Sequence, residues 1–220
     1  MGHRRSVTPS PAPRLCVTTP RGGAVGDLIN HISTMADAAD VAAVLLRCGE
    51  GSEAMGVDHI ARVAVVVQPS GMALLADGPP AVVAQSQADG VHVDGATAGA
   101  LQSACDLFKP RRIVGAGGLK TRHDAMVAGE AGADYVMFGE PDLEGRRPSF
   151  AAVTERVAWW TEVFEVPCVA FAADLDEVGA LAEAGAEFIA LGDFVWSEPG
   201  GPVAAIRAAA ERIAVREFAR

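Results

Sequence analysis

The sequence is poor in cysteine, in positive charge and in long apolar runs, and each shortage excludes a class of protein. Its four cysteines are widely separated and form no CxxC pair, so they indicate reduced core thiols, not disulfides or zinc ligands. Against 28 Asp and Glu it has only 18 Lys and Arg, and the net charge of −10 argues against a nucleic-acid partner. No stretch offers the roughly 18 apolar residues that a membrane span needs. We therefore expect a protein without a membrane or nucleic-acid partner.

What the sequence does contain is enough apolar material for one core. Half of its 220 residues are hydrophobic, which predicts a single sizeable domain. Residues 1–13 carry basic side chains, but no apolar segment follows them as in a signal peptide. We expect a short disordered leader over 1–13, one domain over 14–220, and a cytoplasmic location.

Short runs rich in Val, Ile and Leu alternate along the chain with longer amphipathic, Ala-rich stretches, a pattern typical of βα units that form a parallel sheet. Eight strands are predicted, over 14–19, 41–47, 72–76, 90–93, 112–115, 135–138, 168–171 and 188–191. Helices are predicted over 97–107, 121–131, 150–164, 175–184 and 202–214, with two less sharply bounded ones over 25–38 and 51–67.

A weak internal repeat supports eight units. The phrase Ala-Gly-Ala-Asp-Tyr-Val at 131–136 returns as Ala-Gly-Ala-Glu-Phe-Ile at 184–189, and Ala-Asp-Gly-Val-His-Val at 88–93 is a third version. Each version places a small residue or glycine at a helix end, then an acid, then an apolar strand. The α/β pattern therefore predicts a (β/α)₈ TIM barrel, with an open doubly wound sheet as the alternative.

In a barrel of this kind the chemistry lies in the loops that follow the strands. The polar, charged and glycine residues in those places are Arg47, Cys48, Gly49, Glu50, Asp77, Gly78, His92, Asp94, Gly115, Gly117, Gly118, Lys120, Glu140, Asp142, Glu144, Arg146, Arg147, Asp174, Gly192, Asp193 and Trp196.

Three of these residues are the main candidates, and each has an alternative explanation. Asp77 is either an oxygen ligand for Mg²⁺ or an acid that caps the next helix. Arg47 either binds a phosphate or pairs with Glu50 or Glu53 at the rim. His92 alternates with valines and is a core histidine or a catalytic one.

Three further features have open interpretations. The glycine-rich loop 115–118 either cradles an anion beside Lys120 or is a tight turn. The Arg146-Arg147 pair forms a charged lid or a solvated loop. Adjacent Trp159 and Trp160 in the middle of a helix predict one ring in the core and the other toward solvent or a second subunit.

Read in order, these segments resemble thiamine phosphate synthase and the related thiazole tautomerase. The likeness rests on Leu-Leu-Ala-Asp-Gly at 74–78, Ala-Asp-Gly-Val-His-Val at 88–93, Gly-Ala-Asp-Tyr-Val at 132–136 with Gly139, and Ala-Gly-Ala-Glu-Phe-Ile at 184–189. The resemblance implies a (β/α)₈ barrel that joins hydroxymethylpyrimidine diphosphate to a thiazole phosphate and releases pyrophosphate, with Mg²⁺ holding the pyrophosphate.

The resemblance also assigns roles to individual residues. It implies that Arg47 and Arg147 are catalytic, that Asp77 binds the metal, and that phosphorylated substrates contact five further residues. These substrate-binding residues are His92, Gly115, Gly117, Gly139 and Gly192.

The chain departs from the family motifs at several positions. The second metal carboxylate falls at Thr97, with Asp94 nearby, and the fifth-strand serine falls at Gly117. Ala172 and Ala173 replace the glycine pair beside the phosphate, and Asp193 adds a negative charge there.

These departures leave three hypotheses. The chain is a divergent synthase, a non-catalytic member that binds another phosphorylated molecule or acts as an interaction partner, or a tautomerase with His92 as its base. A homodimer is a further possibility, because barrels with apolar helix faces often pair.

Overall fold

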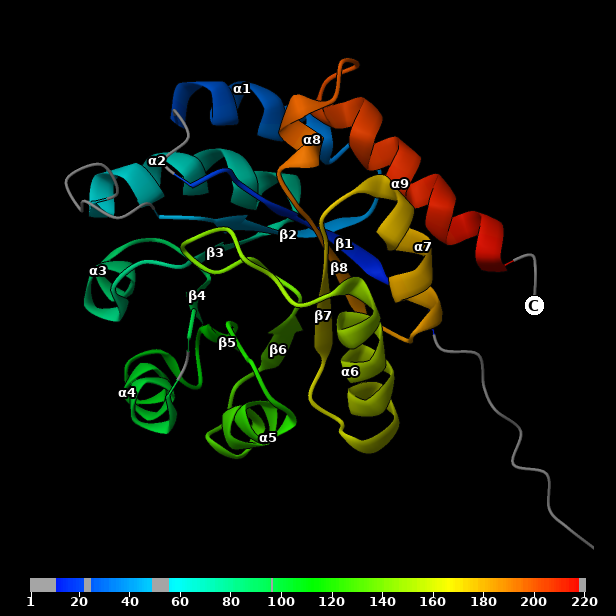
Figure 1. The fold of residues 1–220 in the computed structure, drawn as a ribbon. Coiled ribbons are helices and arrows are strands. Elements are labelled where there is room, and N and C mark those ends of the chain that lie inside the picture. The colour runs from blue at the N-terminus through cyan, green and yellow to red at the C-terminus, as the bar shows by residue number, and fades with distance from the viewer. Residues whose placement is uncertain (1–10, 22–24, 49–55, 96, 218–220) are drawn as a thin grey trace, which may run out of the picture.

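The chain folds into a closed barrel of eight parallel strands surrounded by helices (Figure 1). The computed structural model describes residues 11–21, 25–48, 56–95 and 97–217. The strands pair in sequence order, and β1 closes the ring by pairing Cys16 with Ala190 of β8. The strands are β1 (Arg14–Thr18), β2 (Val41–Leu46), β3 (Ala73–Ala76), β4 (Gly90–Val93), β5 (Ile113–Ala116), β6 (Tyr135–Phe138), β7 (Cys168–Ala172) and β8 (Phe188–Leu191). The prediction of a (β/α)₈ barrel is confirmed, and the open sheet is excluded.

A helix follows each strand and packs on the outside of the barrel. These elements are α1 (Val25–Met35), α2 (Val57–Val67) with a 3₁₀ turn (Gln68–Ser70), α3 (Pro80–Gln85), α4 (Ala98–Phe108), α5 (Arg122–Glu130), α6 (Phe150–Val163), α7 (Leu175–Glu183), α8 (Phe194–Ser197) and α9 (Pro202–Glu217). Helix α9 completes the outer ring by contacting both α7 and α1.

The strand bounds agree with the prediction to within one residue, whereas some helices differ from it. Helix α1 ends at Met35, because the next residues form a turn in which the Ala38 N–H donates to the Met35 carbonyl. The predicted start of the second helix, 51–55, lies outside the described residues. Helix α8 was not predicted, because a single turn is too short to show a helical period.

Side-chain caps fix where several helices begin, and one of them positions a residue of the site. The Asp174 carboxylate accepts hydrogen bonds from the Asp176 and Glu177 N–H groups, so α7 starts directly after β7. Glu177 is thereby held in the first turn of α7, at the C-terminal end of the barrel.

The seam between the first and last strands carries side-chain bonds in addition to its ladder. The Thr18 hydroxyl donates to the Leu191 carbonyl at 2.8 Å. The Trp196 indole N–H, on α8, donates to the Thr18 carbonyl, also at 2.8 Å. The seam is therefore anchored at the same end of the barrel as the residues that follow the strands.

Two apolar layers fill the fold, one between strands and helices and the other inside the barrel. Trp160 belongs to the outer layer and stacks on Phe164 with ring centroids 4.1 Å apart. Trp159 is half-buried, and the Arg122 guanidinium lies 4.7 Å above its ring. The two neighbouring rings thus face different surroundings, as their spacing predicts.

The described cysteines are all free, and three of them are buried. Cys48 is the exception, since it is only half-buried and follows β2 at the C-terminal end of the barrel. Among the described residues, no helix combines the length and apolar character that crossing a membrane requires.

Candidate active site

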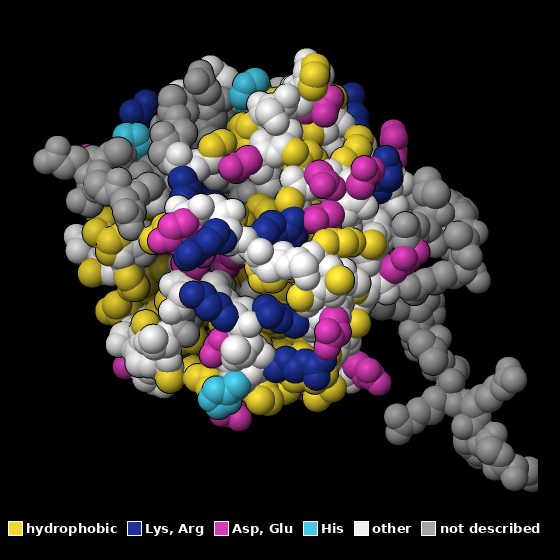
Figure 2. All heavy atoms as spheres, in the orientation of Figure 1, with side chains coloured by type: hydrophobic (Ala, Val, Ile, Leu, Met, Phe, Trp, Pro, Cys, Tyr) yellow, Lys and Arg dark blue, Asp and Glu magenta, His cyan; other side chains and the backbone are white. Residues whose placement is uncertain are grey.

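The loops after the strands enclose a cavity of about 650 Å³ at the C-terminal end of the barrel, which we call the mouth. Charged groups from five loops line it, among them Arg21, Asp77, Asp94, Lys120 and Arg146. A second cavity of about 210 Å³ adjoins it and shares Gly118, Lys120, Asp142 and Arg146 with it. Figure 2 shows Lys and Arg side chains gathered over the centre of one face, with Asp and Glu between and around them.

Asp77 lies on the floor of the mouth and is the centre of its charge network. Its side chain is only 1% exposed, and its Oδ1 accepts a short hydrogen bond from the Cys48 N–H. Its Oδ2 accepts from Arg21 Nη1 at 3.1 Å and lies 3.5 Å from Arg47 Nε. Burial raises the pKa of Asp77, and the Cys48 N–H and Arg21 oppose that shift. The predicted metal ligand is therefore a buried carboxylate surrounded by donors.

Asp94 belongs to the same network, because Arg21 bridges the two carboxylates. Arg21 Nη2 donates to Asp94 Oδ2 at 3.0 Å. We call these three residues the Asp77–Asp94 end of the mouth. Asp94 thus stands close to Asp77, although the family motif would place the second carboxylate at Thr97.

Arg47 is buried beside Asp77 with an unused donor. The residue is 4% exposed, its backbone N–H donates to the Thr19 hydroxyl at 2.9 Å, and its Nε has no hydrogen-bond partner. Glu50 and Glu53, the pairing partners expected for Arg47 at the rim, lie outside the described residues, as does Gly49. An unsatisfied guanidinium donor this deeply buried is suited to an anionic ligand.

The Cys48 thiol also faces the mouth, but it is not a nucleophile. Burial, with the nearby Asp77 carboxylate, raises the pKa of Cys48 to about 12. A thiol with such a pKa stays protonated near neutral pH and is unreactive.

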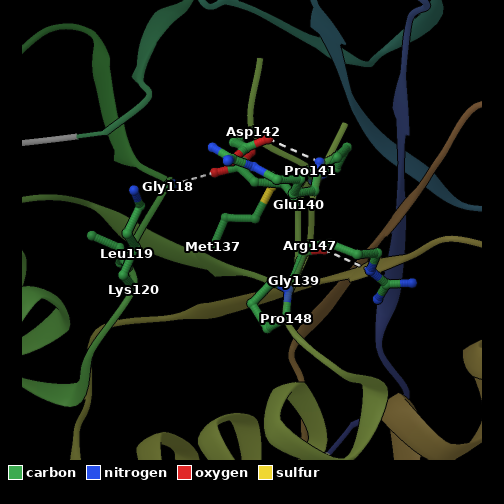
Figure 3. Close-up of a pocket in the computed structure, with 11 residues that line it drawn as sticks. Gly118, Leu119, Lys120, Met137, Gly139, Glu140, Pro141, Asp142, Arg147 and Pro148 are labelled. Atoms are coloured by element: carbon green, nitrogen blue, oxygen red, sulfur yellow. Dashed lines mark hydrogen bonds and ion pairs between the residues drawn. The ribbon is translucent and has the colours of Figure 1, made fainter. Parts of the chain in front are cut away.

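His92 lines the mouth and belongs to a buried relay with Tyr135 and Glu140. Its Nδ1 lies 2.8 Å from the Tyr135 hydroxyl, and its Nε2 lies 3.2 Å from Glu140 Oε2. The other oxygen of Glu140 accepts a short hydrogen bond from the Gly118 N–H (Figure 3). His92 and Glu140 are both buried, so the relay joins β4, β6 and the glycine-rich loop.

The charges of this relay depend on each other. Burial opposes the charged imidazolium, but Glu140, with smaller contributions from Asp77 and Asp94, raises the pKa of His92. Burial likewise opposes the charged carboxylate, yet His92 lowers the pKa of Glu140. Burial keeps Tyr135 protonated by raising its pKa well above the usual value. The pair is therefore a buried ion pair with a neutral phenol beside it.

Glycines in β5 and directly after it make room for this relay. A Cβ at Gly115 would overlap the Tyr135 ring, and one at Gly117 would overlap the Glu140 carboxylate and the His92 ring. Neither glycine lines the two cavities of the mouth, whereas Gly118 lines both. Substrate binding by Gly115 and Gly117 stays a prediction, and the structure gives these glycines a packing reason.

The opposite end of the mouth is built around Arg147, and we call Arg147, Glu177 and Ala173 the Arg147–Glu177 end. Arg147 Nη1 lies 2.9 Å from both Glu177 oxygens, and its Nε donates to the Gly139 carbonyl at 3.1 Å (Figure 3). Glu177 Oε2 also accepts from the Ala173 N–H at 2.8 Å. Arg147 Nη2 is buried and has no hydrogen-bond partner. A side-chain carboxylate thus occupies a backbone N–H and a guanidinium, donors that suit an anion.

Gly139 and Gly192 flank this end. Gly139 has φ of 93° and lines the smaller cavity, and a side chain there would overlap Val153. A side chain at Gly192 would overlap the Phe171 ring and the Ala172 carbonyl, and Gly192 lines neither cavity. Asp193 is exposed and also lines neither. The carboxylate bonded to the Ala173 backbone is Glu177, not Asp193.

The loop after β6 forms the outer rim. Arg146 is exposed and lies 2.9 Å from Asp142 and 3.0 Å from Glu144. The Arg146 N–H also donates to the Asp142 carboxylate at 2.8 Å. The loop carries charges of both signs and lines both cavities. These features fit a charged lid as well as a solvated loop.

Two site residues were not predicted from the sequence, and a third was predicted without its partner. Arg21 follows β1, and the residues after that strand are not among the predicted candidates. Glu140 was among the acids after the sixth strand, but nothing in the sequence links it to His92. Glu177 lies within a helix, where the rule about strand ends does not look. The rule itself, applied to all eight strands, would have found Arg21.

Fold and mouth together define a (β/α)₈ barrel with a charged cavity at the C-terminal ends of its strands, where barrels of this class place their active sites. A family model described as thiamine monophosphate synthase matches residues 15–194, and the chain belongs to that family.

Named relatives agree with this assignment, and a solved structure shares the fold. The chain is 37% identical to a thiamine-phosphate synthase of Rhodospirillum centenum over 178 residues, covering 77% of this chain and 83% of the relative. It is 34% identical to one of Hyphomonas neptunium over 214 residues, covering 92% and 95%. The structure of thiamine phosphate pyrophosphorylase from Pyrococcus furiosus superposes with a TM-score of 0.74 at 16% identity, covering 92% of this chain and 96% of that one.

Proposed function

We propose that this chain is a thiamine phosphate synthase of thiamine biosynthesis, joining hydroxymethylpyrimidine diphosphate to thiazole phosphate with release of pyrophosphate. The observation that carries the proposal is Arg47, a guanidinium that is 4% exposed, lies beside Asp77 and keeps an unsatisfied Nε. The family match and the relatives named above support it.

The reaction breaks one bond and forms another. The C–O bond between the pyrimidine methylene and the diphosphate breaks, and the electron pair leaves with pyrophosphate. The thiazole nitrogen then donates its electron pair to the methylene carbon, forming the C–N bond. The protein must stabilise the charge on the leaving group and hold the nitrogen in line.

The cations of the mouth suit the first of these tasks. Arg47 keeps a free donor beside Asp77, and Arg21, Lys120 and Arg146 line the mouth. Arg147 stays a predicted catalytic residue, and its buried, unpartnered Nη2 is the donor that Glu177 and Gly139 leave free. His92 is held by Tyr135 and Glu140, so we assign it to shaping the floor below the substrate.

We also propose that Mg²⁺ binds at the Asp77–Asp94 end. The described residues contain no group of three or more His, Cys, Asp or Glu side chains placed to hold a metal. Two carboxylates nevertheless converge there on one cation, Arg21, and Mg²⁺ is commonly held by one or two carboxylates together with substrate phosphates and water. When bound, Mg²⁺ supplies positive charge to the leaving pyrophosphate.

A turnover assay on purified protein tests the function. With both phosphorylated precursors and Mg²⁺, thiamine phosphate should accumulate, and Asp77→Ala should lower the rate about 100-fold or more. Glu155→Gln is the matched control, because it removes an exposed carboxylate that pairs with Arg122 outside the mouth. No turnover at high enzyme concentration, with binding of another phosphorylated molecule, would favour the non-catalytic hypothesis instead.

Two further predictions concern the whole protein. We propose a homodimer, which sedimentation of the purified chain tests directly. A cytoplasmic location likewise stays a prediction, which imaging of a tagged chain in its own cell would test.

A further inference from the structure

Arg21 occupies the space between the two carboxylates of the mouth. Its two terminal nitrogens divide between them, with Nη1 3.1 Å from Asp77 Oδ2 and Nη2 3.0 Å from Asp94 Oδ2. One planar fork thus spans two acids that come from different strands, β3 and β4. The arrangement is partly shielded, since Asp77 is buried while Arg21 and Asp94 are half-buried.

The charges around this pair require a cation. Two neighbouring carboxylates repel each other, and the repulsion grows where water is excluded. Arg47 contributes a second guanidinium only to Asp77, at 3.5 Å, and that contact is not a hydrogen bond. Asp94 has Arg21 as its ion-pair partner among the described residues. Arg21 is therefore the group that balances both acids together.

We propose that Arg21 competes with Mg²⁺ for Asp77 and Asp94, so that the free protein holds its own cation where the metal would bind. The fork and the ion would occupy the same space between the two acids, where their positive charges repel each other. Binding of Mg²⁺ must therefore displace the guanidinium, and the cost of displacement lowers the apparent affinity of the free protein for Mg²⁺.

A diphosphate removes this cost. Once displaced, the fork of Arg21 faces an anion with several oxygens in the same cavity, and a guanidinium binds such oxygens in a bidentate manner. Metal and diphosphate therefore bind better together than either binds alone. This step rests on the proposed function for the diphosphate, whereas the competition for Mg²⁺ is a property of the free protein.

Calorimetry of Mg²⁺ binding to the free protein tests the competition without any turnover. Arg21→Gln should bind Mg²⁺ at least about tenfold more tightly than the unchanged protein. Arg21→Lys should fall between the two, because a single ammonium does not span both acids as the fork does. Adding Asp94→Asn to Arg21→Gln should abolish the gain. Equal or weaker Mg²⁺ binding by Arg21→Gln, with unchanged circular dichroism, overturns the proposal.

The matched control is Arg122→Gln, which removes an exposed arginine paired with Glu155. It should leave Mg²⁺ affinity unchanged, and a gain in this variant too would mean that net charge, not position, sets the affinity.

A second titration uses inorganic pyrophosphate in the presence of saturating Mg²⁺. Here Arg21→Gln should bind about tenfold more weakly, the reverse of its effect on Mg²⁺ alone. Tighter pyrophosphate binding in Arg21→Gln would overturn the transfer of Arg21 to the diphosphate. Because neither titration measures thiamine phosphate, a failed turnover assay and a failed competition are distinguishable.

Discussion

The two ends of the mouth balance their charges in opposite ways. At the Asp77–Asp94 end, two carboxylates share one guanidinium, and the side chain in the middle is the cation Arg21. At the Arg147–Glu177 end, a guanidinium and a backbone N–H share one carboxylate, and the side chain in the middle is the anion Glu177. Each end holds a side chain of the sign opposite to its surroundings.

Because of this difference, ligands of opposite charge compete with the side chains of the two ends. A metal ion competes with Arg21 at the first end, whereas an anionic ligand competes with Glu177 at the second. A phosphate that approaches Ala173 meets a carboxylate already bound to that N–H, and the repulsion costs affinity. The family resemblance implied a phosphate near Ala172 and Ala173, and Glu177 is the residue that limits it.

The largest expected effect concerns the packing of Gly117 against Glu140 and His92. Gly117→Ala would drive a methyl group into the Glu140 carboxylate and the His92 ring, and overpacking of this kind costs about 2 kcal/mol. Thermal denaturation should show a loss of about 4–8 °C. Gly99→Ala in α4 is the control, because no heavy atom lies within 4 Å of its added Cβ, and it should be neutral or stabilising. Equal stability of the two variants would show that the relay does not need the space at Gly117.

The second prediction removes the anion at the Arg147–Glu177 end. Glu177→Ala should free the Ala173 N–H and Arg147 Nη1, so inorganic phosphate should bind about tenfold more tightly, a change of about 1.4 kcal/mol. Calorimetry with phosphate measures this change directly. Asp176→Asn, an exposed neighbour on the same helix, is the control and should have no effect. If both variants bind phosphate with the same affinity, Glu177 does not block the Ala173 N–H, and the contrast between the two ends disappears.

The smallest expected effect is the pH dependence of the stability that His92 and Glu140 contribute. Asp77 and Asp94 also raise the pKa of His92, which couples this pair to the Asp77–Asp94 end. The folded-state pKa of His92 is raised above 6.5. Its contribution to folding stability is therefore complete below pH 6.5 and is lost as the pH rises through the raised value. The pKa of Glu140 is lowered below 4.5, so its contribution is complete above pH 4.5 and is lost on acidification through the lowered value.

The two contributions overlap between about pH 4.5 and 6.5. The difference in melting temperature between the unchanged protein and Glu140→Gln should be largest in that window and smaller on either side. A difference that is constant from pH 4 to 9 would show that the pair is not ionised in the folded protein.

Much of the fold could be predicted because strand runs and helix starts are local signals. The apolar run before Arg47 and the acid repeated before β4, β6 and β8 indicated the barrel closely, and β2 ends one residue before its predicted end. The single turn of α8 could not be predicted, since four residues show no period.

The site was predictable only where a residue's place follows from its strand. Asp77 and Arg47 end neighbouring strands, and the structure brings them within 3.5 Å. The link between His92 and Glu140 depends on two strands separated by β5 and on the absence of side chains at Gly115 and Gly117. Glu177 contacts Arg147 and the Ala173 N–H because Asp174 fixes the start of α7. Such distances between elements are not encoded in any short stretch of sequence.

The seam between β1 and β8 determines when this site can form during protein synthesis. Thr18 bonds to Leu191 and Trp196, which lie 173 and 178 residues further along the chain. A ribosome needs on the order of ten seconds or more to synthesise that length, and during this time β1 has no partner on one side. The barrel therefore closes late in synthesis, and Arg21, just beyond that first strand, reaches its final position among residues made long after it.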